Sequence, residues 1–143
     1  MKISTRGRYA IRVMLDLAEH NNGEYIPLMD IAGRQEVSEK YLESIVAALS
    51  KNKFVNALRG KGGGYRLAKA PEDYTIGSIL RVTEGSLAPI ACLEAEENPC
   101  NRAADCRTLK MWQDFYQLIH DYFENITLQD LLDENADAGN YII

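Results

Sequence analysis

The sequence predicts a mainly α-helical protein that carries one small β-hairpin. Apolar residues recur every three or four positions along much of the chain, which is the spacing of amphipathic helices. A glycine-rich segment at 60–64 separates two short segments that suit strands. The third observation is a long apolar stripe near the C-terminus, which predicts a helix from about 103 to 125.

The first helix is expected over about 6–20. Ser4 or Thr5 can supply the side-chain oxygen that caps its first turn, and the polar stretch HNNG at 20–23 ends it. Its apolar face is formed by Tyr9, Ile11, Val13, Met14, Leu17 and Ala18.

Two shorter helices follow, and a tight turn joins them. Pro27 opens the second helix, over 28–35, at the first-turn position where a proline costs no hydrogen bond. Ser38 caps the third helix, near 39–52, whose apolar residues again recur at helical spacing. Two short helices in this order are typical of a helix-turn-helix.

The hairpin that comes next determines which kind of helix-turn-helix the sequence predicts. Residues 54–59 (FVNALR) alternate apolar and polar side chains as a half-buried strand does, and residues 65–67 (YRL) return. The glycines of 60–64 (GKGGG) permit the positive φ that a tight turn needs. Three helices and a basic, glycine-tipped hairpin predict a winged helix-turn-helix, which we assign to residues 1–75.

Residues 76–143 are predicted to form a second part, with a loop and further helices. Thr75 caps a helix over 76–85, and Thr127 caps a short closing helix, TLQDLLDEN. Residues 86–106 show no convincing period and are expected to form an ordered loop at best.

The long predicted helix needs a partner surface for its apolar stripe. That partner is either the N-terminal half of the same chain or the same helix of a second subunit, and we favour the second subunit. The long helix is therefore expected to be a C-terminal dimerisation helix, with contacts from Leu109, Trp112, Phe115, Ile119, Tyr122 and Phe123.

Charge divides the chain into two halves. The net charge is -5, but residues 1–70 hold 12 Lys and Arg against 7 Asp and Glu, whereas residues 71–143 hold 4 against 14. A polyanion can therefore bind the first half and is repelled by the second. A random fluctuation of surface charge is the alternative interpretation.

Composition and hydropathy exclude several classes. With 46% hydrophobic and 26% charged residues, neither a disordered nor a collagen-like chain is expected. No apolar run is long enough to cross a bilayer. Arg8, Arg12 and Asp16 interrupt the N-terminal apolar residues, which argues against a signal peptide. We therefore expect a cytoplasmic protein without a membrane partner.

The candidate nucleic-acid contacts lie on the hairpin and on the third helix. Arg59 and Lys61 can reach phosphates or enter a minor groove. Glu43 either accepts from a cytosine amino group or is an ordinary solvated residue. Lys61 is followed by Gly62 and not by Ser or Thr, so a P-loop is not expected. The N-terminal end of the third helix, which a recognition helix directs to the major groove, presents Ser38, Lys40, Tyr41, Glu43 and Ser44.

Three cysteines, Cys92, Cys100 and Cys106, lie in the loop without periodicity, with the spacing C-x7-C-x5-C. Clustered thiols in a cytosolic protein suggest metal or redox chemistry more than structural disulfides. The three thiolates could hold an iron–sulfur cluster if a fourth ligand came from elsewhere, or they are incidental. Nearby acidic candidates for that ligand are Glu94, Glu96, Glu97 and Asp105.

Nothing in the sequence supports catalysis. His20 and His120 lie in or beside different predicted helices, and no arrangement of nucleophile and base can be argued. We therefore expect a protein that is not an enzyme.

Three segments of the sequence resemble the Rrf-two (Rrf2) family of winged-helix transcriptional regulators, which has an IscR-like iron–sulfur branch and a CymR-like cysteine-metabolism branch. The N-terminal segment reads MKISTRGRYAIRVMLDLA, and ITLQDLL lies near the C-terminus. The most specific match is SEKYLE followed by LRGKGGGYRL. The C-terminal TLQDLLDENADAGNYII is more similar to the CymR branch.

The resemblance implies a homodimer that binds a pseudo-palindromic DNA operator. The helix that begins at Ser38 would read the major groove, and the wing, with Arg59, Gly62 and Gly63, would enter the minor groove. The residues implied to steady the DNA backbone are Thr5, Arg6 and Tyr9.

The three cysteines fall where cluster-binding members of the family carry theirs. Leu109 stands where the IscR-like branch has a histidine ligand, and Arg8 stands where other members have an acidic one. The fourth ligand is therefore unknown. CymR-like members lack the cysteines and respond through a partner enzyme of cysteine synthesis.

The sequence thus predicts a dimeric, sequence-specific DNA-binding regulator that senses iron–sulfur or cysteine status through the three-cysteine loop. One alternative is a CymR-like repressor without a cluster, controlled by a cysteine-synthesis enzyme. Another is a winged-helix module that docks onto protein, and a third is a carrier of metal clusters.

Overall fold

The computed structural model describes residues 2–138, so the last five residues of the C-terminal segment quoted above lie outside it. Helices dominate, and there is one two-stranded sheet among these residues. The α-helices and strands are α1 (Thr5–Glu19), α2 (Leu28–Gln35), α3 (Glu39–Lys51), β1 (Val55–Leu58), β2 (Gly64–Leu67), α4 (Ile76–Glu84), α5 (Leu109–Glu124) and α6 (Leu128–Ala138). Short 3₁₀ turns lie at η1 (Pro71–Asp73), η2 (Ala91–Leu93) and η3 (Ala103–Asp105).

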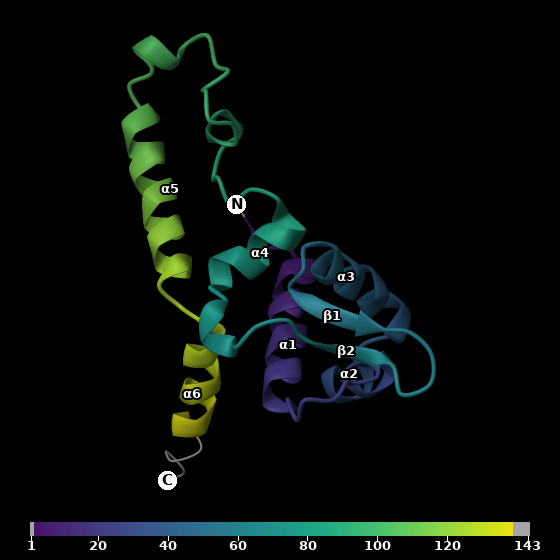
Figure 1. Cartoon of the computed structure of the whole chain (residues 1–143). Coiled ribbons are helices and arrows are strands. Elements are labelled where there is room, and N and C mark those ends of the chain that lie inside the picture. Colours follow the sequence, from purple (N-terminus) through teal and green to yellow (C-terminus); the bar gives the residue numbers. More distant parts are fainter. Residues whose placement is uncertain (1, 139–143) are drawn as a thin grey trace.

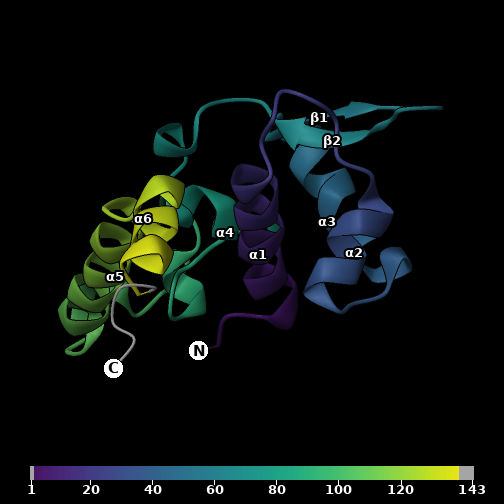
Figure 2. The ribbon, with the colours of Figure 1, turned by 90° about the horizontal axis from the view of Figure 1, so that it is seen from below.

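The helices are arranged in three groups. In Figure 1, α2, α3 and the β1–β2 hairpin lie on one side, α1 and α4 lie in the middle, and α5 and α6 follow one another along the opposite side. Figure 2 shows the same order from below, with the hairpin projecting away from α5 and α6. The predicted mainly α fold with a winged helix-turn-helix is confirmed.

Side-chain caps explain where four of the helices begin. Each predicted cap residue offers an oxygen to a backbone amide in the first helical turn, which satisfies a donor that the helix leaves free. At α6 the bond is reciprocal, because the amide of Thr127 donates back to Asp130 Oδ2 (2.9 Å). The four cap bonds are Gly7 N to Ser4 Oγ (3.0 Å), Tyr41 N to Ser38 Oγ (3.1 Å), Ser78 N to Thr75 Oγ1 (3.1 Å) and Asp130 N to Thr127 Oγ1 (3.1 Å).

The bounds predicted for the second helix are confirmed, but the position of Pro27 relative to it differs from the prediction. Pro27 is the N-cap residue of α2 and not a residue of its first turn. Its φ of -60° and ψ of 141° place it in extended backbone, so the helix begins at Leu28 and covers the predicted residues 28–35. Because its ring nitrogen carries no hydrogen, Pro27 leaves no unsatisfied donor there.

A third segment pairs with the wing hairpin. In the hairpin, β1 and β2 are antiparallel, with Val55 opposite Leu67 and Leu58 opposite Gly64. The segment before α2 adds a single bridge, because Ile26 and Tyr65 exchange two backbone hydrogen bonds of 2.8 Å each. The wing is therefore held to the start of α2 as well as to the end of α3.

The half-buried alternation predicted for 54–59 is wrong beyond the first residues. Val55 is the buried residue of β1, whereas Ala57 is exposed and Leu58 keeps 46% of its surface exposed. The reason is that the hairpin leaves the body of the protein after Val55, so its outer half has no layer to pack against (Figure 2).

One apolar core connects both parts of the chain. It includes helices on both sides of residue 75, because α4 packs against α1 and α3. Tyr74 and Leu128 are also buried in it, so the chain before α4 and the start of α6 belong to the same core. The largest contributions from helices are Val13, Met14 and Leu17 of α1, Leu42, Ile45, Val46 and Leu49 of α3, and Ile76, Ile79 and Leu80 of α4.

The long C-terminal helix is shorter than predicted. It begins at Leu109 and not near 103, because residues 103–105 form the separate turn η3 and Cys106 has extended backbone (φ -75°, ψ 111°). The closing helix is longer than predicted and runs to Ala138. Within residues 2–138, none of the helices combines the length and the apolarity needed to cross a bilayer.

Candidate nucleic-acid interface

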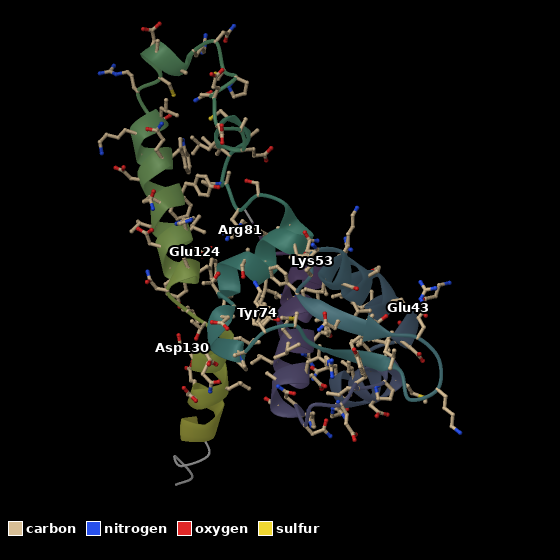
Figure 3. All side chains as sticks on the ribbon, in the orientation of Figure 1. Glu43, Lys53, Tyr74, Arg81, Glu124 and Asp130 are labelled. Carbon is tan, nitrogen blue, oxygen red and sulfur yellow. The ribbon has the colours of Figure 1, made fainter. Side chains whose placement is uncertain are left out.

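The candidate DNA-reading surface is the first turn of α3 together with the wing. Ser38 is used as the helix cap, and Ser38, Lys40, Glu43 and Ser44 are all exposed. Glu43 lies on the side of the molecule remote from α5 (Figure 3). The predicted recognition residues of α3 are thus brought together on one exposed helical end.

Two contacts tie this end of α3 to the first turns of α1. The rings of Tyr9 and Tyr41 pack edge to face, with their centroids 5.7 Å apart. The Arg6 guanidinium donates through Nη2 to the Ser44 carbonyl oxygen (3.2 Å). Thr5 is exposed beside them and accepts a bond from Arg8 (3.2 Å). The predicted residues of α1 therefore lie next to the predicted reading helix.

An open groove runs between α3 and the wing. Its volume is about 770 Å³. Glu39, Glu43 and Ala47 of α3 line one side, and Leu58, Arg59 and Gly63 line the other. The sugar–phosphate ridge between a major and a minor groove has to pass between a recognition helix and its wing, so this groove has the position that a DNA strand requires.

Glycines give the wing its shape. Gly60 and Gly62 have φ of 92° and 76°, which L-residues with a Cβ rarely adopt. A Cβ on Gly63 would collide with the Leu58 carbonyl, and a Cβ on Gly64 would collide with the Ile26 carbonyl. The tip carries Lys61, and Arg59 precedes it, both exposed. The hairpin therefore presents two cations on a narrow loop whose backbone can approach a groove closely.

Sequence reasoning missed some residues of this groove. Met29 of α2 is 67% exposed and lines it together with Lys51 and Leu58. No motif marks these residues, because their position depends on how α2 and the wing pack. The one available signal for Met29 is its place in the first turn of α2, away from the apolar side of that short helix.

The cysteine loop lies at the opposite end of the molecule from the wing. It runs from α4 to the start of α5 and carries η2 and η3 (Figure 1). Cys92 is half-buried in η2, whereas Cys100 and Cys106 are exposed, and all three are free thiols. Within residues 2–138, no three Cys, His, Asp or Glu side chains meet in a group that could hold a metal ion.

The donor atoms of this loop fit an iron–sulfur cluster in type. Hydrogen bonds from Thr108 lower the pKa of Cys106, which favours the thiolate, the form that binds metal. The Nδ2 atom of Asn98, two residues before Cys100, is buried and has no acceptor among the described residues. An amide of this kind suits a cluster, whose sulfides accept hydrogen bonds. No fourth ligand is identified, because within residues 2–138 none of the acidic candidates Glu94, Glu96, Glu97 and Asp105 forms a metal-binding group with two of the cysteines.

A second exposed surface is apolar and lies on α5. Met111, Phe115, Leu118 and Tyr122 recur at helical spacing and are all exposed, Leu118 by 68% and Tyr122 by 64%. The predicted dimerisation residues divide between this surface and the chain's own core. Phe115 and Tyr122 belong to the exposed stripe, Leu109 and Trp112 are half-buried, and Ile119 and Phe123 pack on the core of the same chain.

Glu124 joins α5 to α4. Its carboxylate forms an ion pair with Arg81 (2.5 Å) and accepts from the Thr75 hydroxyl (3.0 Å). Figure 3 shows Arg81 and Glu124 facing each other between the two helices. Burial raises the pKa of Glu124, but the hydrogen bonds from Arg81 and Thr75 outweigh it, so the net shift is downward.

Comparison with known proteins gives one consistent family. A model of the Rrf2 family, described as an iron-dependent transcriptional regulator, matches residues 3–134. The HTH-type transcriptional regulator IscR of Erwinia tasmaniensis is 37% identical over 132 residues, which cover 92% of this chain and 79% of that protein.

Two solved structures resemble this chain over nearly its whole length. The first is CymR (YrzC), the global cysteine regulator of B. subtilis, with a TM-score of 0.75 and 34% identity, covering 94% of this chain and 98% of that one. The second is IscR of T. potens, with a TM-score of 0.76 and 36% identity, covering 96% of this chain and 90% of that one. These relatives are transcriptional regulators and not enzymes.

Proposed function

This chain belongs to the Rrf2 family of winged-helix, DNA-binding transcriptional regulators, and from that premise we propose that it acts as a homodimer on a pseudo-palindromic operator and responds to the state of its cysteine loop. Each subunit reads one half-site, with the first turn of α3 in the major groove and the wing in the adjacent minor groove. The protein acts in the cytoplasm, where its operator is.

One observation carries the DNA-reading part of the proposal. The first turn of α3 and the wing line the two sides of a single open groove, and Arg59 and Lys51 lie along it. Lys40 and Lys61 are exposed at its two flanking elements, and Arg6 fixes α1 to the reading helix. Glu39 and Glu43 also line the groove, so its two cations lie beside two carboxylates. The net positive charge of residues 1–70 supports steering of DNA to this half of the chain.

The reading residues have separate roles in this proposal. Ser38, Lys40, Tyr41, Glu43 and Ser44 contact base edges or phosphates, and Glu43 accepts from a cytosine amino group. Arg59 enters the minor groove, while Gly62 and Gly63 allow the wing backbone to approach closely. Thr5, Arg6 and Tyr9 hold the adjoining backbone strand and the orientation of α3.

The homodimer is supported by the apolar stripe of α5. Four large apolar side chains lie exposed on one helical face, and a second copy of α5 offers a matching surface. Because α5 follows directly after the cysteine loop, a change in that loop can move α5 and reset the spacing of the two reading heads.

We propose that the loop senses iron–sulfur status. Cys92, Cys100 and Cys106 would hold the cluster together with a fourth ligand that remains to be found, and such a cluster, when bound, supplies redox and iron sensitivity. The support is the thiol donor set, the lowered pKa of Cys106, and the buried unpaired amide of Asn98.

A response to thiol or cysteine status without a cluster is the second candidate. It is favoured by the exposure of Cys100 and Cys106 and by the absence of an assembled three-ligand group in residues 2–138. Control by a cysteine-synthesis enzyme, as a binding partner of the dimer, belongs to this second candidate. Similarity to CymR over almost the whole chain supports it.

The DNA-reading proposal is tested by selecting duplexes from a randomised library and measuring affinity by fluorescence anisotropy. Arg59→Ala should weaken binding to the selected duplex by roughly 1–3 kcal/mol if Arg59 makes a specific contact. Lys110→Ala is the control, since Lys110 is an exposed cation of α5 paired with Asp114. Equal affinities of Arg59→Ala and wild type would contradict the role of Arg59. If no duplex is selected at any salt concentration, low salt included, the result would favour a protein-docking module.

The two sensing candidates are separated by purification without oxygen, followed by visible absorbance and assays of iron and acid-labile sulfide. Stoichiometric iron and sulfide, lost in Cys100→Ala while the dimer persists, support the cluster. A colourless protein that also fails reconstitution supports thiol or partner-enzyme sensing. Cluster transfer to an acceptor with no effect on DNA affinity would instead indicate a carrier.

A further inference from the structure

The carboxylate of Glu84 is bound at the N-terminus of α1, although Glu84 belongs to α4. The backbone amide of Ser4 donates to Glu84 Oε1 (3.2 Å), and the Ser4 hydroxyl donates to the same oxygen. No acidic residue lies in the first turn of α1 itself. Glu84 therefore supplies from another helix the negative charge that a helix N-terminus favours.

The fit at this contact is close. Gly7 is buried in the first turns of α1, and a Cβ at that position would collide with the Glu84 carboxylate. The side chain of Thr83 would lie 3.3 Å from the same Cβ. The end of α4 thus occupies space that a larger residue in α1 would fill, so a side chain at position 7 would displace the Glu84 carboxylate.

The same contact is where the cysteine loop begins. Glu84 is the last residue of α4, Gly85 ends the helix with a φ of 76°, and Leu87 is then buried in the core. Ile3, Glu84 and residues 86–89 line one small cavity of about 120 Å³. Figures 1 and 2 both show the chain that enters α1 beside the start of this loop.

From the first turn of α1, the contact reaches the reading helix. Arg6 is two residues after Ser4 and donates to the Ser44 carbonyl oxygen of α3 (3.2 Å). We propose that Glu84 is a positioning residue for DNA recognition, which holds the first turn of α1 and, through Arg6, the orientation of α3 relative to the start of the cysteine loop. This inference rests on the proposed function, because it names how the loop reaches the reading surface.

Positioning by Glu84 and simple charge repulsion predict opposite effects of removing Glu84 on DNA affinity, which gives the proposal a sharp test. Removing a carboxylate from a DNA-binding protein should strengthen its binding to every duplex. Positioning by Glu84 instead requires that Glu84→Ala binds the selected duplex at least about fivefold more weakly. Binding to a scrambled duplex should stay the same or tighten. Glu72→Ala is the matched control, since the exposed Glu72 carboxylate has no partner among residues 2–138.

Two further variants separate positioning from general loss of structure. Glu84→Gln keeps an oxygen acceptor for Ser4 and should restore most of the preference for the selected duplex. Gly7→Ala leaves all charges in place and disturbs the same contact, so it should lower that preference as Glu84→Ala does. Thermal unfolding followed by circular dichroism shows whether each variant is folded, and hydrogen exchange of residues 39–46 reports the mobility of α3 directly.

The link to the loop is tested from the loop side. Leu87→Ala removes the buried anchor of the loop and should also lower the preference for the selected duplex. Added to Glu84→Ala, it should cause little further loss, because both act through one contact. Full additivity, or a uniform gain in affinity of Glu84→Ala for both duplexes, would overturn the proposal. If wild type selects no duplex, the proposed function fails first, and the two failures are therefore distinguishable.

Discussion

Tyr74 is the residue that closes the base of the wing. Its hydroxyl donates to the Phe54 carbonyl (2.6 Å) and accepts from the amides of Ala68 (3.0 Å) and Lys69 (2.9 Å), so one buried group satisfies both ends of the hairpin. Burial raises the pKa of Tyr74, and the two amide bonds offset only part of that shift. The side chain is therefore a neutral hydrogen-bond centre at neutral pH.

Replacing this hydroxyl should destabilise the whole domain. Tyr74→Phe removes three hydrogen bonds and leaves the Lys69 amide without a partner, whereas Ala68 N still donates to the Phe54 carbonyl (3.3 Å). We expect a loss of about 1–3 kcal/mol in the free energy of unfolding measured with urea. Tyr25→Phe is the control, because the hydroxyl of Tyr25 has no hydrogen-bond partner among the described residues. A Tyr74→Phe change no larger than that of Tyr25→Phe would show that water replaces the lost bonds.

The site at the residue scale was predictable where it depends on local chemistry. Ser38, Thr75 and Thr127 were assigned as caps from the sequence, and Ser4 was one of two candidates beside Thr5. Each of these four accepts a bond from its helix. Glu84 could not be recognised in this way, because its partner lies 80 residues away in the sequence. A side chain that caps another helix leaves no local pattern.

At the scale of elements, the wing depends on two glycines for different reasons. Gly62 supplies a positive φ in the turn, whereas Gly64 also brings β2 against the backbone of Ile26. The hairpin strands bury little apolar surface beyond Val55. The wing is thus positioned by backbone contact and by Tyr74 more than by apolar packing.

Gly64→Ala should separate the wing from α2. The added Cβ meets the Ile26 carbonyl and Pro27 nitrogen at a φ of 151°, so we expect a loss of roughly 1–3 kcal/mol in stability and weaker operator binding. Gly33→Ala is the matched control, because no atom lies within 4 Å of its Cβ and alanine is the better helix former. Unchanged stability and affinity in Gly64→Ala would contradict the requirement for close approach.

At the scale of the whole molecule, one side of α5 is held to the chain by Ile119, Phe123 and the Glu124 ion pair, and the other side exposes an apolar stripe. Glu124 meets Arg81 and Thr75 of the α4 region, while Met111, Phe115, Leu118 and Tyr122 remain exposed. The orientation of α5, and with it the proposed dimer surface, therefore depends on this pair together with the core contacts of Ile119 and Phe123.

The pair predicts a dependence of stability on acid. The pKa of Glu124 is lower in the folded state, so its contribution is present above the unfolded value of about 4.3 and is lost as the pH falls through the folded pKa. Glu124→Gln should be less stable than wild type at pH 7, and the difference should shrink below about pH 4. Urea unfolding between pH 3 and 7 measures it. A difference that stays constant with pH would show that the charge of Glu124 is not the cause.

The stripe predicts how the subunits associate. Leu118→Glu places a charge at the centre of the proposed dimer surface, so we expect monomers by sedimentation or light scattering. Operator binding should be weaker, because a monomer carries one DNA-reading surface and the dimer carries two linked ones. Gln113→Glu adds the same charge to α5 away from the stripe and should remain dimeric. A dimeric Leu118→Glu protein would place the interface elsewhere.

The sequence by itself determined what depends on short-range chemistry. Periodicity, caps and the glycine turn identified the helices and the hairpin, and they placed the candidate DNA-reading residues Ser38 to Ser44 at the start of the third helix. The long helix was predicted six residues too early, since Cys106 adopts extended backbone that periodicity alone cannot reveal. Only the tertiary structure decided which face of α5 is free and that α4 caps α1. Spacing shows which side chains share a face, whereas burial depends on where distant helices pack.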